Sequence, residues 1–271
     1  MFYGCKFHQV VIGETMNYIE FGQGQQSLII LPGLGDGLSP IHGQVQAIVF
    51  ALSYKQFAKA FKVYLFSRKN RLEVGYSTRD MAKDQAEALK VLGISKANVL
   101  GVSQGGMIAQ YLAIDYPDLV NKLVLAVTLS KQNETIYKVI NGWMKMAKQG
   151  DYKSLMIDTA EKSYSEKYLK KYRFLYPLLG RVGKPKDFGR FLIQAESCIR
   201  HNSYFELNKI VCPTLIIGGD SDKIVGADSA SELSAEIKDS ELFTYKGLGH
   251  ATYEEAEDFN NRILNFLCNS K

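Results

Sequence analysis

Cysteine, histidine and proline are scarce in this 271-residue chain, and long apolar runs are missing. The four cysteines are far apart and form no CxxC pair, which argues against a disulfide framework, against a zinc site and for a reducing compartment. No apolar stretch approaches the ~18 residues needed to span a bilayer. The first residues, MFYGCKFHQVV, show no basic segment followed by an apolar one, so no signal peptide is evident. We therefore expect a cytoplasmic protein.

Positive charge is concentrated in one part of the chain. The net charge is +5, but residues 131–209 hold 16 Lys or Arg against 8 Asp or Glu, whereas the remainder holds 17 against 20. A basic segment could favour anionic ligands, a membrane surface or nucleic acid. No nucleic-acid-binding motif accompanies it. We interpret it as a solvated helical surface and expect neither a nucleic-acid partner nor a membrane span.

Apolar stretches and helical patterns alternate along most of the chain. Two alternating stretches, at 7–11 and 16–21, predict an antiparallel hairpin that turns near Gly13. Further strands are predicted at 27–31, 63–66, 97–100, 122–127, 213–217 and 242–245. Helices are predicted at about 40–59, from Ser77 (with Asp80 in a capping box), after residue 103, at 228–237 and at 254–267. This alternation indicates parallel βαβ units and an α/β fold.

The alternation is interrupted once. Residues 131–209 are rich in lysine and tyrosine, show several helical stretches and contain no convincing strand. We predict that they form a helical cap, and that residues 1–130 and 210–271 form one core domain. A cap inserted between two strands would lie over the strand ends, where open α/β sheets bind ligands.

The sequence Gly101-Val102-Ser103-Gln104-Gly105 fits the G-x-S-x-G nucleophile elbow. An apolar strand precedes it and a helical pattern follows it, which is the context that the motif requires. Glycines at both ends allow the sharp turn and the close backbone approach. Ser103 is therefore the candidate nucleophile, and since a free serine is a poor nucleophile, it needs a base.

Only four histidines can supply that base. His8 lies in the predicted hairpin, His42 near the start of the first predicted helix, and His201 near the end of the cap. His250 follows the last predicted strand on a glycine-containing loop, at the same sheet end as Ser103. His250 is the candidate base.

A carboxylate is expected between the serine and the histidine, in the order Ser–Asp–His. Asp220 and Asp222 both follow the strand at 213–217. We favour Asp222, because it leaves the loop room to extend towards His250. Asp220, beside two glycines, is expected to hydrogen-bond its own turn. An acid at this position would fix the imidazole tautomer.

Two backbone N–H groups are expected to bind the oxyanion of a tetrahedral intermediate. One is that of Gln104, at the start of the helix after the nucleophile. The other is that of Leu34, in the loop LPGLGDG that follows the strand at 27–31. This loop lacks the spacing of a phosphate-binding glycine loop.

These motifs resemble those of the α/β-hydrolase superfamily, within its capped esterases, lactonases, C–C hydrolases and cofactor-free haloperoxidases. The resemblance covers about residues 16–129 and 210–267. It implies an α/β-hydrolase fold, no metal or organic cofactor, and the roles given above for Ser103, Asp222, His250, Leu34 and Gln104. Two departures are Pro32-Gly33 in place of His-Gly, and SRKNRLEVGYS at 67–77 in place of D-x-R-G-x-G-x-S.

The resemblance implies a serine hydrolase acting on a small carboxylic ester, thioester or lactone through an acyl-enzyme. The same triad also serves C–C, amide and peracid chemistry, and a slow-turnover ligand receptor can share the fold. Aromatic residues of the cap, with Trp143 and Tyr168 as candidates, are predicted to line the substrate pocket, although simple packing of the cap on the core is the alternative. We expect a monomer or a homodimer.

Overall fold

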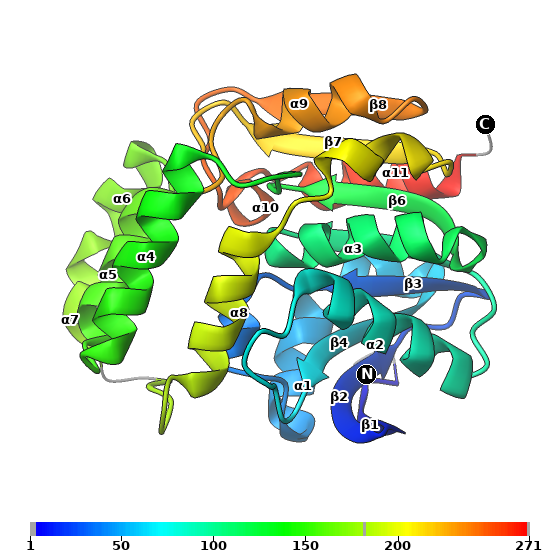
Figure 1. Ribbon diagram of the computed structural model, residues 1–271, viewed down its shortest axis with the longest axis horizontal. Coiled ribbons are helices and arrows are strands. Elements are labelled where there is room, and N and C mark those ends of the chain that lie inside the picture. The colour runs from blue at the N-terminus through cyan, green and yellow to red at the C-terminus, as the bar shows by residue number, and fades with distance from the viewer. Residues whose placement is uncertain (1–3, 181–182, 270–271) are drawn as a thin grey trace.

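An eight-stranded sheet forms the centre of the computed structural model, which describes residues 4–180 and 183–269 (Figure 1). Its order is β1-β2-β4-β3-β5-β6-β7-β8. The strands are β1 (Lys6–Ile12), β2 (Glu14–Phe21), β3 (Gln26–Leu31), β4 (Phe61–Lys69), β5 (Ala97–Val102), β6 (Val120–Ala126), β7 (Thr214–Gly219) and β8 (Ser240–Tyr245).

The sheet is mostly parallel with an antiparallel edge. β1 and β2 form a hairpin, and β2 also pairs antiparallel with β4. Gly13 makes the hairpin turn with a φ of 78°, a conformation that favours glycine. All pairs from β4 to β8 are parallel. The predicted α/β sheet with an N-terminal antiparallel hairpin is confirmed.

Helices cover both faces of the sheet because successive side chains of a strand point to opposite sides. Ile29 and Leu31 belong to one buried cluster with residues of α2 (Thr78–Val91), α3 (Gln104–Asp115) and α9 (Ser229–Glu236). Leu28 and Ile30 belong to the opposite cluster with α1 (Gly43–Ser53) and α11 (Phe259–Cys268). Burial on both faces explains why the central strands are almost wholly apolar.

Two predicted helices are shorter than expected. The helix predicted at 40–59 begins only at Gly43 and breaks at Tyr54, whose φ and ψ of −110° and 18° leave the helical region. A 3₁₀ turn, η2 (Lys55–Lys59), follows it. The helix predicted at 254–267 consists of α10 (Thr252–Glu255) and α11, separated where Ala256 is extended. Further 3₁₀ turns are η1 (Leu34–Gly37), η3 (Pro117–Leu119), η4 (Arg173–Leu175) and η5 (Tyr204–Lys209).

The chain between β6 and β7 forms a helical insert, residues 131–209, beside the sheet (Figure 1). Its helices are α4 (Glu134–Lys148), α5 (Tyr152–Ser163), α6 (Glu166–Tyr172), α7 (Tyr176–Leu179) and α8 (Gly189–Arg200). A third buried cluster joins apolar residues of α4, α5 and α8 to Leu34, Met107 and Val225 of the core. An isolated bridge between Lys131 and Asn202 joins the two ends of the insert. The insert is therefore packed on the core rather than separate from it.

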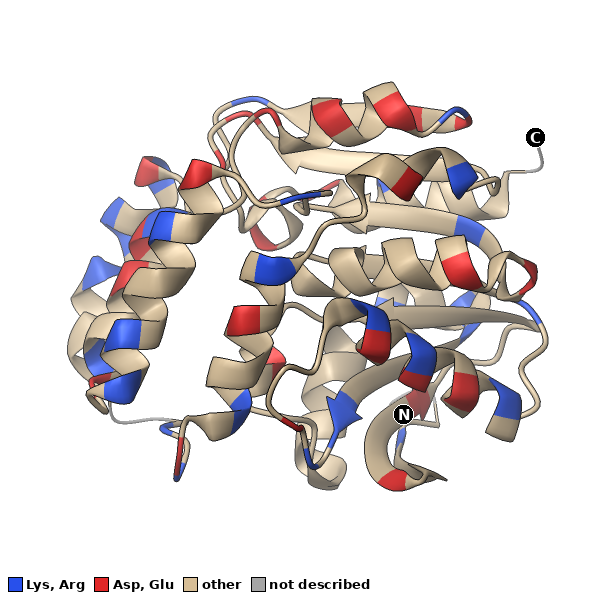
Figure 2. Cartoon of the chain, viewed as in Figure 1, with Lys and Arg blue, Asp and Glu red and all other residues tan. Residues whose placement is uncertain are grey.

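The basic residues of the insert are interspersed with acidic ones along its helices (Figure 2). Lys138 pairs with Glu134 at 2.5 Å, and Arg173 pairs with both Glu161 and Glu166. Exposed pairs of this kind contribute little to stability. In the part of the chain that the structure describes, no helix is long and apolar enough to cross a bilayer.

Candidate active site

Ser103 lies on a strained turn between β5 and α3. Its φ and ψ are 54° and −118°, a conformation that non-glycine residues rarely adopt. A Cβ added to Gly101 would lie 2.5 Å from the carbonyl oxygen of Gly105, and a Cβ added to Gly105 would lie 1.9 Å from that of Leu31. These distances are too short for any side chain. Glycine is therefore required on both sides of Ser103 for the turn to form.

Ser103, His250 and Asp222 form a continuous hydrogen-bonded chain. The Nε2 of His250 lies 2.9 Å from the Oγ of Ser103, and its Nδ1 lies 2.8 Å from Oδ2 of Asp222. The other carboxylate oxygen of Asp222 accepts from the backbone N–H groups of Ile224 and Val225, at 2.8 and 3.0 Å. His250 and Asp222 are both buried. Both oxygens of the Asp222 carboxylate are thus hydrogen-bonded, so the carboxylate is held in place and fixes the imidazole ring of His250 in one orientation.

Asp220 lies apart from this chain of hydrogen bonds. Its Oδ1 accepts from the N–H of Gly247 at 2.7 Å and from the hydroxyl of Ser221 at 2.9 Å. It therefore bonds Ser221 in its own turn, as expected, and also joins this turn to the loop of Gly247.

The other three histidines are in different environments. His8 stacks on Tyr18 in the hairpin, and His42 is exposed. His201 is buried, with its ring nitrogens near the hydroxyl groups of Thr78 and Ser203. Burial lowers the pKa of His201 to about 3, so its imidazole stays neutral at physiological pH. Of the four histidines, His250 is the one that contacts Ser103.

The loop that starts at Pro32 passes directly beside Ser103. A Cβ added to Gly33 would lie 3.2 Å from the Cβ of Ser103. Leu34 follows as the first residue of η1. Gln104 follows Ser103 as the first residue of α3, and its side chain turns into the protein, where its Nε2 donates to the carbonyl of Gln194 in α8 at 2.8 Å. Leu34 thus lines the same pocket as Ser103, and Gln104 directly follows Ser103 in the chain.

A pocket of about 410 Å³ opens at Ser103, a volume suited to a small-molecule ligand. Both Ser103 and His250 line it. Most of the other lining residues are apolar or aromatic, and they include Leu34, Ile41, Phe50, Tyr54, Val102, Met107, Ile136, Ile140, Trp143, Ile224 and Tyr253. Polar lining groups include Gln46, Thr159, Ser163 and Glu254. The walls come from the core and from α4, α5 and α8 of the insert.

Trp143 and Tyr168, the two aromatic residues predicted to line the pocket, have different surroundings. Trp143 lines it from α4, and its indole N–H donates to Asp158 at 2.7 Å. Tyr168 is not among the described residues that line the pocket. Its ring lies between those of Tyr164 and Tyr172, with centroids 4.4 Å away on each side. Aromatic stacking along the insert holds that ring.

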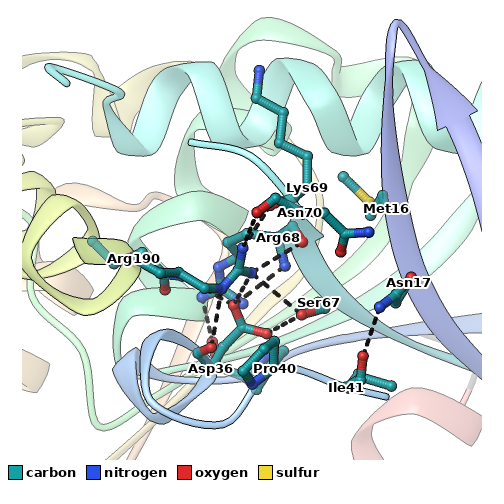
Figure 3. A network of polar contacts seen from close by, with 12 residues as sticks. Met16, Asn17, Asp36, Pro40, Ile41, Ser67, Arg68, Lys69, Asn70 and Arg190 are labelled. Atoms are coloured by element: carbon teal, nitrogen blue, oxygen red, sulfur yellow. Dashed lines mark hydrogen bonds and ion pairs between the residues drawn. The ribbon is translucent and has the colours of Figure 1, made fainter. Parts of the chain in front are cut away.

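A buried polar network behind the pocket was not predicted (Figure 3). Asp36 of η1 accepts from Ser67, from the backbone N–H of Arg68 and from Nη2 of Arg190 in α8. Burial alone would raise the pKa of Asp36, but the guanidinium groups of Arg190 and Arg68 outweigh it and hold the pKa below its usual range. Arg68 in turn donates to the carbonyl of Pro32 and to Oε1 of Gln104. The network joins the loop beside Ser103 to β4 and to the insert.

The insert also contacts the loop that carries His250. The backbone N–H of Ala251 donates to the carbonyl of Ser163 at 2.8 Å. Further along α10, Glu254 accepts from the Tyr164 hydroxyl, and Glu255 accepts from the N–H and the hydroxyl of Ser165. These bonds hold α10 against the end of α5.

In the described part of the chain, no group of three or more His, Cys, Asp or Glu residues is placed so that it could hold a metal ion. Cys198 lines the pocket, but burial raises the pKa of its thiol to about 12, so it stays protonated at neutral pH.

Comparison with known proteins agrees with this architecture. The chain is 27% identical to a 2-hydroxy-6-oxononadienedioate/2-hydroxy-6-oxononatrienedioate hydrolase of a Pseudomonas species, over 97% of this chain and 96% of the relative. It is 26% identical to mouse serine hydrolase BPHL, over 95% of this chain and 84% of the relative.

Solved structures show the same fold. The MGS-M2 α/β hydrolase from a deep-sea metagenome superposes with a TM-score of 0.82 at 22% identity, over 98% of both chains. The enol-lactonase from Burkholderia xenovorans LB400 also gives 0.82, at 19% identity, over 97% of this chain and 100% of the other. The family model described as alpha/beta hydrolase fold matches residues 26–166, more than half of the chain. The chain therefore belongs to the α/β-hydrolase family.

Proposed function

We propose that the protein is a serine hydrolase that cleaves a small carboxylic ester, thioester or lactone through an acyl-enzyme on Ser103. The observation that carries the proposal is the continuous contact from Ser103 Oγ through His250 to Asp222, at 2.9 and 2.8 Å, at the floor of a 410 Å³ pocket. A nucleophile, a base and a group that orients the base are the parts that this chemistry needs.

The proposed reaction begins when His250 Nε2 takes the proton of Ser103 and the Oγ attacks the substrate carbonyl carbon. The backbone N–H groups of Leu34 and Gln104 would hold the negative oxygen of the tetrahedral intermediate. Protonated His250 then gives its proton to the leaving group, and an acyl-enzyme remains. Water, activated by the same imidazole, releases the acid and restores Ser103. Asp222 keeps Nδ1 protonated and stabilises the imidazolium.

A second candidate is hydrolysis of a C–C bond on the same three residues. It is favoured by the relatives named as hydrolases of hydroxy-oxo-dienedioates, which match over nearly the whole chain. Amide or peracid chemistry, or a slow-turnover receptor, would use the same site residues, because fold and triad do not fix the substrate.

We further propose that residues 131–209 act as a cap that forms part of the substrate pocket, on a core of residues 1–130 and 210–271. The proposal is supported by the lining residues that α4, α5 and α8 contribute. The contacts from Ser163 and Tyr164 to the loop of His250 also support it, since movement of the cap would then move the base.

The test is covalent labelling combined with turnover. A sulfonyl fluoride or an organophosphonate should add once per chain, and Ser103→Ala should abolish the label and lower ester turnover by about 10⁶. The matched control is Ser231→Ala, a change at an exposed serine of α9, which should leave both unchanged. A hydrolase should show kcat in the range of about 1–10³ s⁻¹ on a suitable ester. Labelling of another serine, or turnover that survives Ser103→Ala, would refute the proposal.

A further inference from the structure

Glu254 is the charged group on the pocket wall that lacks a compensating charge. It lies one helical turn after His250, since its backbone N–H donates to the carbonyl of Ala251. Its carboxylate accepts from the hydroxyl of Tyr164, a neutral donor. Partial desolvation of the carboxyl group raises the pKa of Glu254; the hydrogen bond from Tyr164 opposes this effect, and the negative charge of Glu255 adds to it.

The other carboxylate among the lining residues is compensated. Asp36 is buried against Arg190 at 2.7 Å, and its side chain is 1% exposed, so its charge is directed away from a ligand. Among the described residues that line the pocket, there is no lysine and no arginine. The pocket therefore offers a ligand an uncompensated negative charge and no positive one.

Aromatic residues line the same pocket as Glu254. Tyr54 and Tyr253 line the same pocket. The pKa values of both phenols are raised, mainly by burial and to a smaller extent by the negative charge of Glu254, and that of Tyr54 reaches about 12. Both phenols are thus neutral at pH 7. Phe50 lines the pocket beside them. Aromatic rings near a carboxylate favour organic cations, because the ring face and the carboxylate both attract positive charge.

We propose, on the basis of the hydrolase function above, that the pocket accepts substrates with a positively charged ammonium group and rejects those with a carboxylate. Glu254 would pair with the ammonium group, and Tyr54 and Tyr253 would surround it. The Glu254 carboxylate is held by the neutral hydroxyl of Tyr164 and lacks a counter-charge, which a cationic ligand would supply. A carboxylate ligand would instead meet like charge and find no arginine to bind.

This selectivity separates the chain from the relatives named for dienedioate substrates, since a dienedioate carries two carboxylates. Glu254 is then a specificity residue that acts through charge at the wall and takes no part in the proton transfers.

The experiment measures binding and so does not depend on turnover. The only tryptophan of the chain, Trp143, lines the pocket, so quenching of its fluorescence reports occupancy. The probes are phenyltrimethylammonium, its neutral isostere tert-butylbenzene, and benzoate. Each is titrated into the wild-type protein, into Glu254→Gln and into Glu257→Gln, a control at an exposed glutamate that is not among the lining residues.

The ammonium probe should bind at least about tenfold more tightly than benzoate to the wild-type protein. Glu254→Gln, whose amide oxygen can still accept from Tyr164, should weaken the ammonium probe by about tenfold and leave tert-butylbenzene unchanged. Glu257→Gln should change neither. Equal or tighter binding of benzoate, or an ammonium affinity that Glu254→Gln leaves unaltered, would overturn the inference. A failed Ser103 label would refute the hydrolase function alone and leave these binding results valid.

Discussion

Asp36 Oδ2 and Arg190 Nη2 lie 2.7 Å apart and join the loop beside Ser103 to the first turn of α8 (Figure 3). The backbone N–H of Arg68, a residue that is 2% exposed, donates to the same oxygen, and the positive charge of its guanidinium also lowers the pKa of Asp36. A single buried negative charge thus compensates the positive charges of two guanidinium groups. Removal of one partner from such an arrangement costs more than the arrangement itself contributes, because the remaining charges are left without compensation.

The first prediction concerns this carboxylate. Asp36→Asn should lower the free energy of unfolding by about 3–5 kcal/mol, since Arg68 and Arg190 would face each other without a counter-charge. Arg190→Met should cost less, because Asp36 keeps Arg68 and Ser67 as partners. The double variant should be more stable than the sum of the two single losses predicts. Urea denaturation of all three variants measures this coupling. Asp118→Asn, at an exposed position, is the control and should stay within about 0.5 kcal/mol of the wild type.

The second prediction separates the two candidate acids. Asp222→Asn should lower kcat by about 10⁴, because an amide at this position sets the wrong tautomer of His250. Asp220→Asn should have a much smaller effect, since Asp220 contacts Gly247 and Ser221 instead of the imidazole. Steady-state rates on one ester, with melting temperatures as a check on folding, compare the two variants. Equal losses would mean that Asp222 does not orient the base.

The order of the motifs along the chain predicted that Ser103, Asp222 and His250 belong to one site. In the structure, His250 lies within hydrogen-bonding distance of both Ser103 and Asp222. This was possible because the local sequence of an elbow and the position of each loop after a strand depend on short-range backbone chemistry. The mostly parallel sheet followed from apolar strands alternating with helices for a similar reason.

Other features could not be predicted from short stretches. The network of Asp36, Arg68 and Arg190 joins three segments far apart in the chain, and no spacing connects them. The position of a side chain on a helix in the insert depends on how that helix packs on the core. Trp143 and Tyr168 have the same aromatic character, but only packing decides that the first faces the pocket and the second stacks on other tyrosines.

The third prediction concerns acid stability. Burial holds the pKa of His201 at about 3, whereas an unfolded histidine has a pKa of about 6.5. Between these values the unfolded chain binds more protons than the folded one, so stability falls as pH falls. From pH 6.5 to 4.5 this histidine should account for about 2–3 kcal/mol of lost unfolding free energy. His201→Gln should show a correspondingly smaller loss over that interval.

The measurement is urea denaturation at pH 6.5 and 4.5. His42→Gln is the control, because His42 is exposed and its replacement should leave the difference between the two pH values close to that of the wild type. A His201→Gln protein that loses as much stability as the wild type would contradict the prediction.

The last prediction concerns the two aromatic residues of the insert. Trp143 lines the pocket from α4, so Trp143→Phe should enlarge the space beside the acyl chain and shift the preference among p-nitrophenyl esters towards longer chains. Hydrolysis of the acetate ester should change little, because its acyl group is too short to need that wall. Tyr168→Phe should leave the whole profile unchanged, since its ring stacks on Tyr164 and Tyr172 outside the pocket lining. Values of kcat/KM across a series from acetate to octanoate compare both variants with the wild type. A parallel fall for every ester in Trp143→Phe, accompanied by a lower Tm, would show that Trp143 supports packing through its bond to Asp158 and does not select the acyl chain.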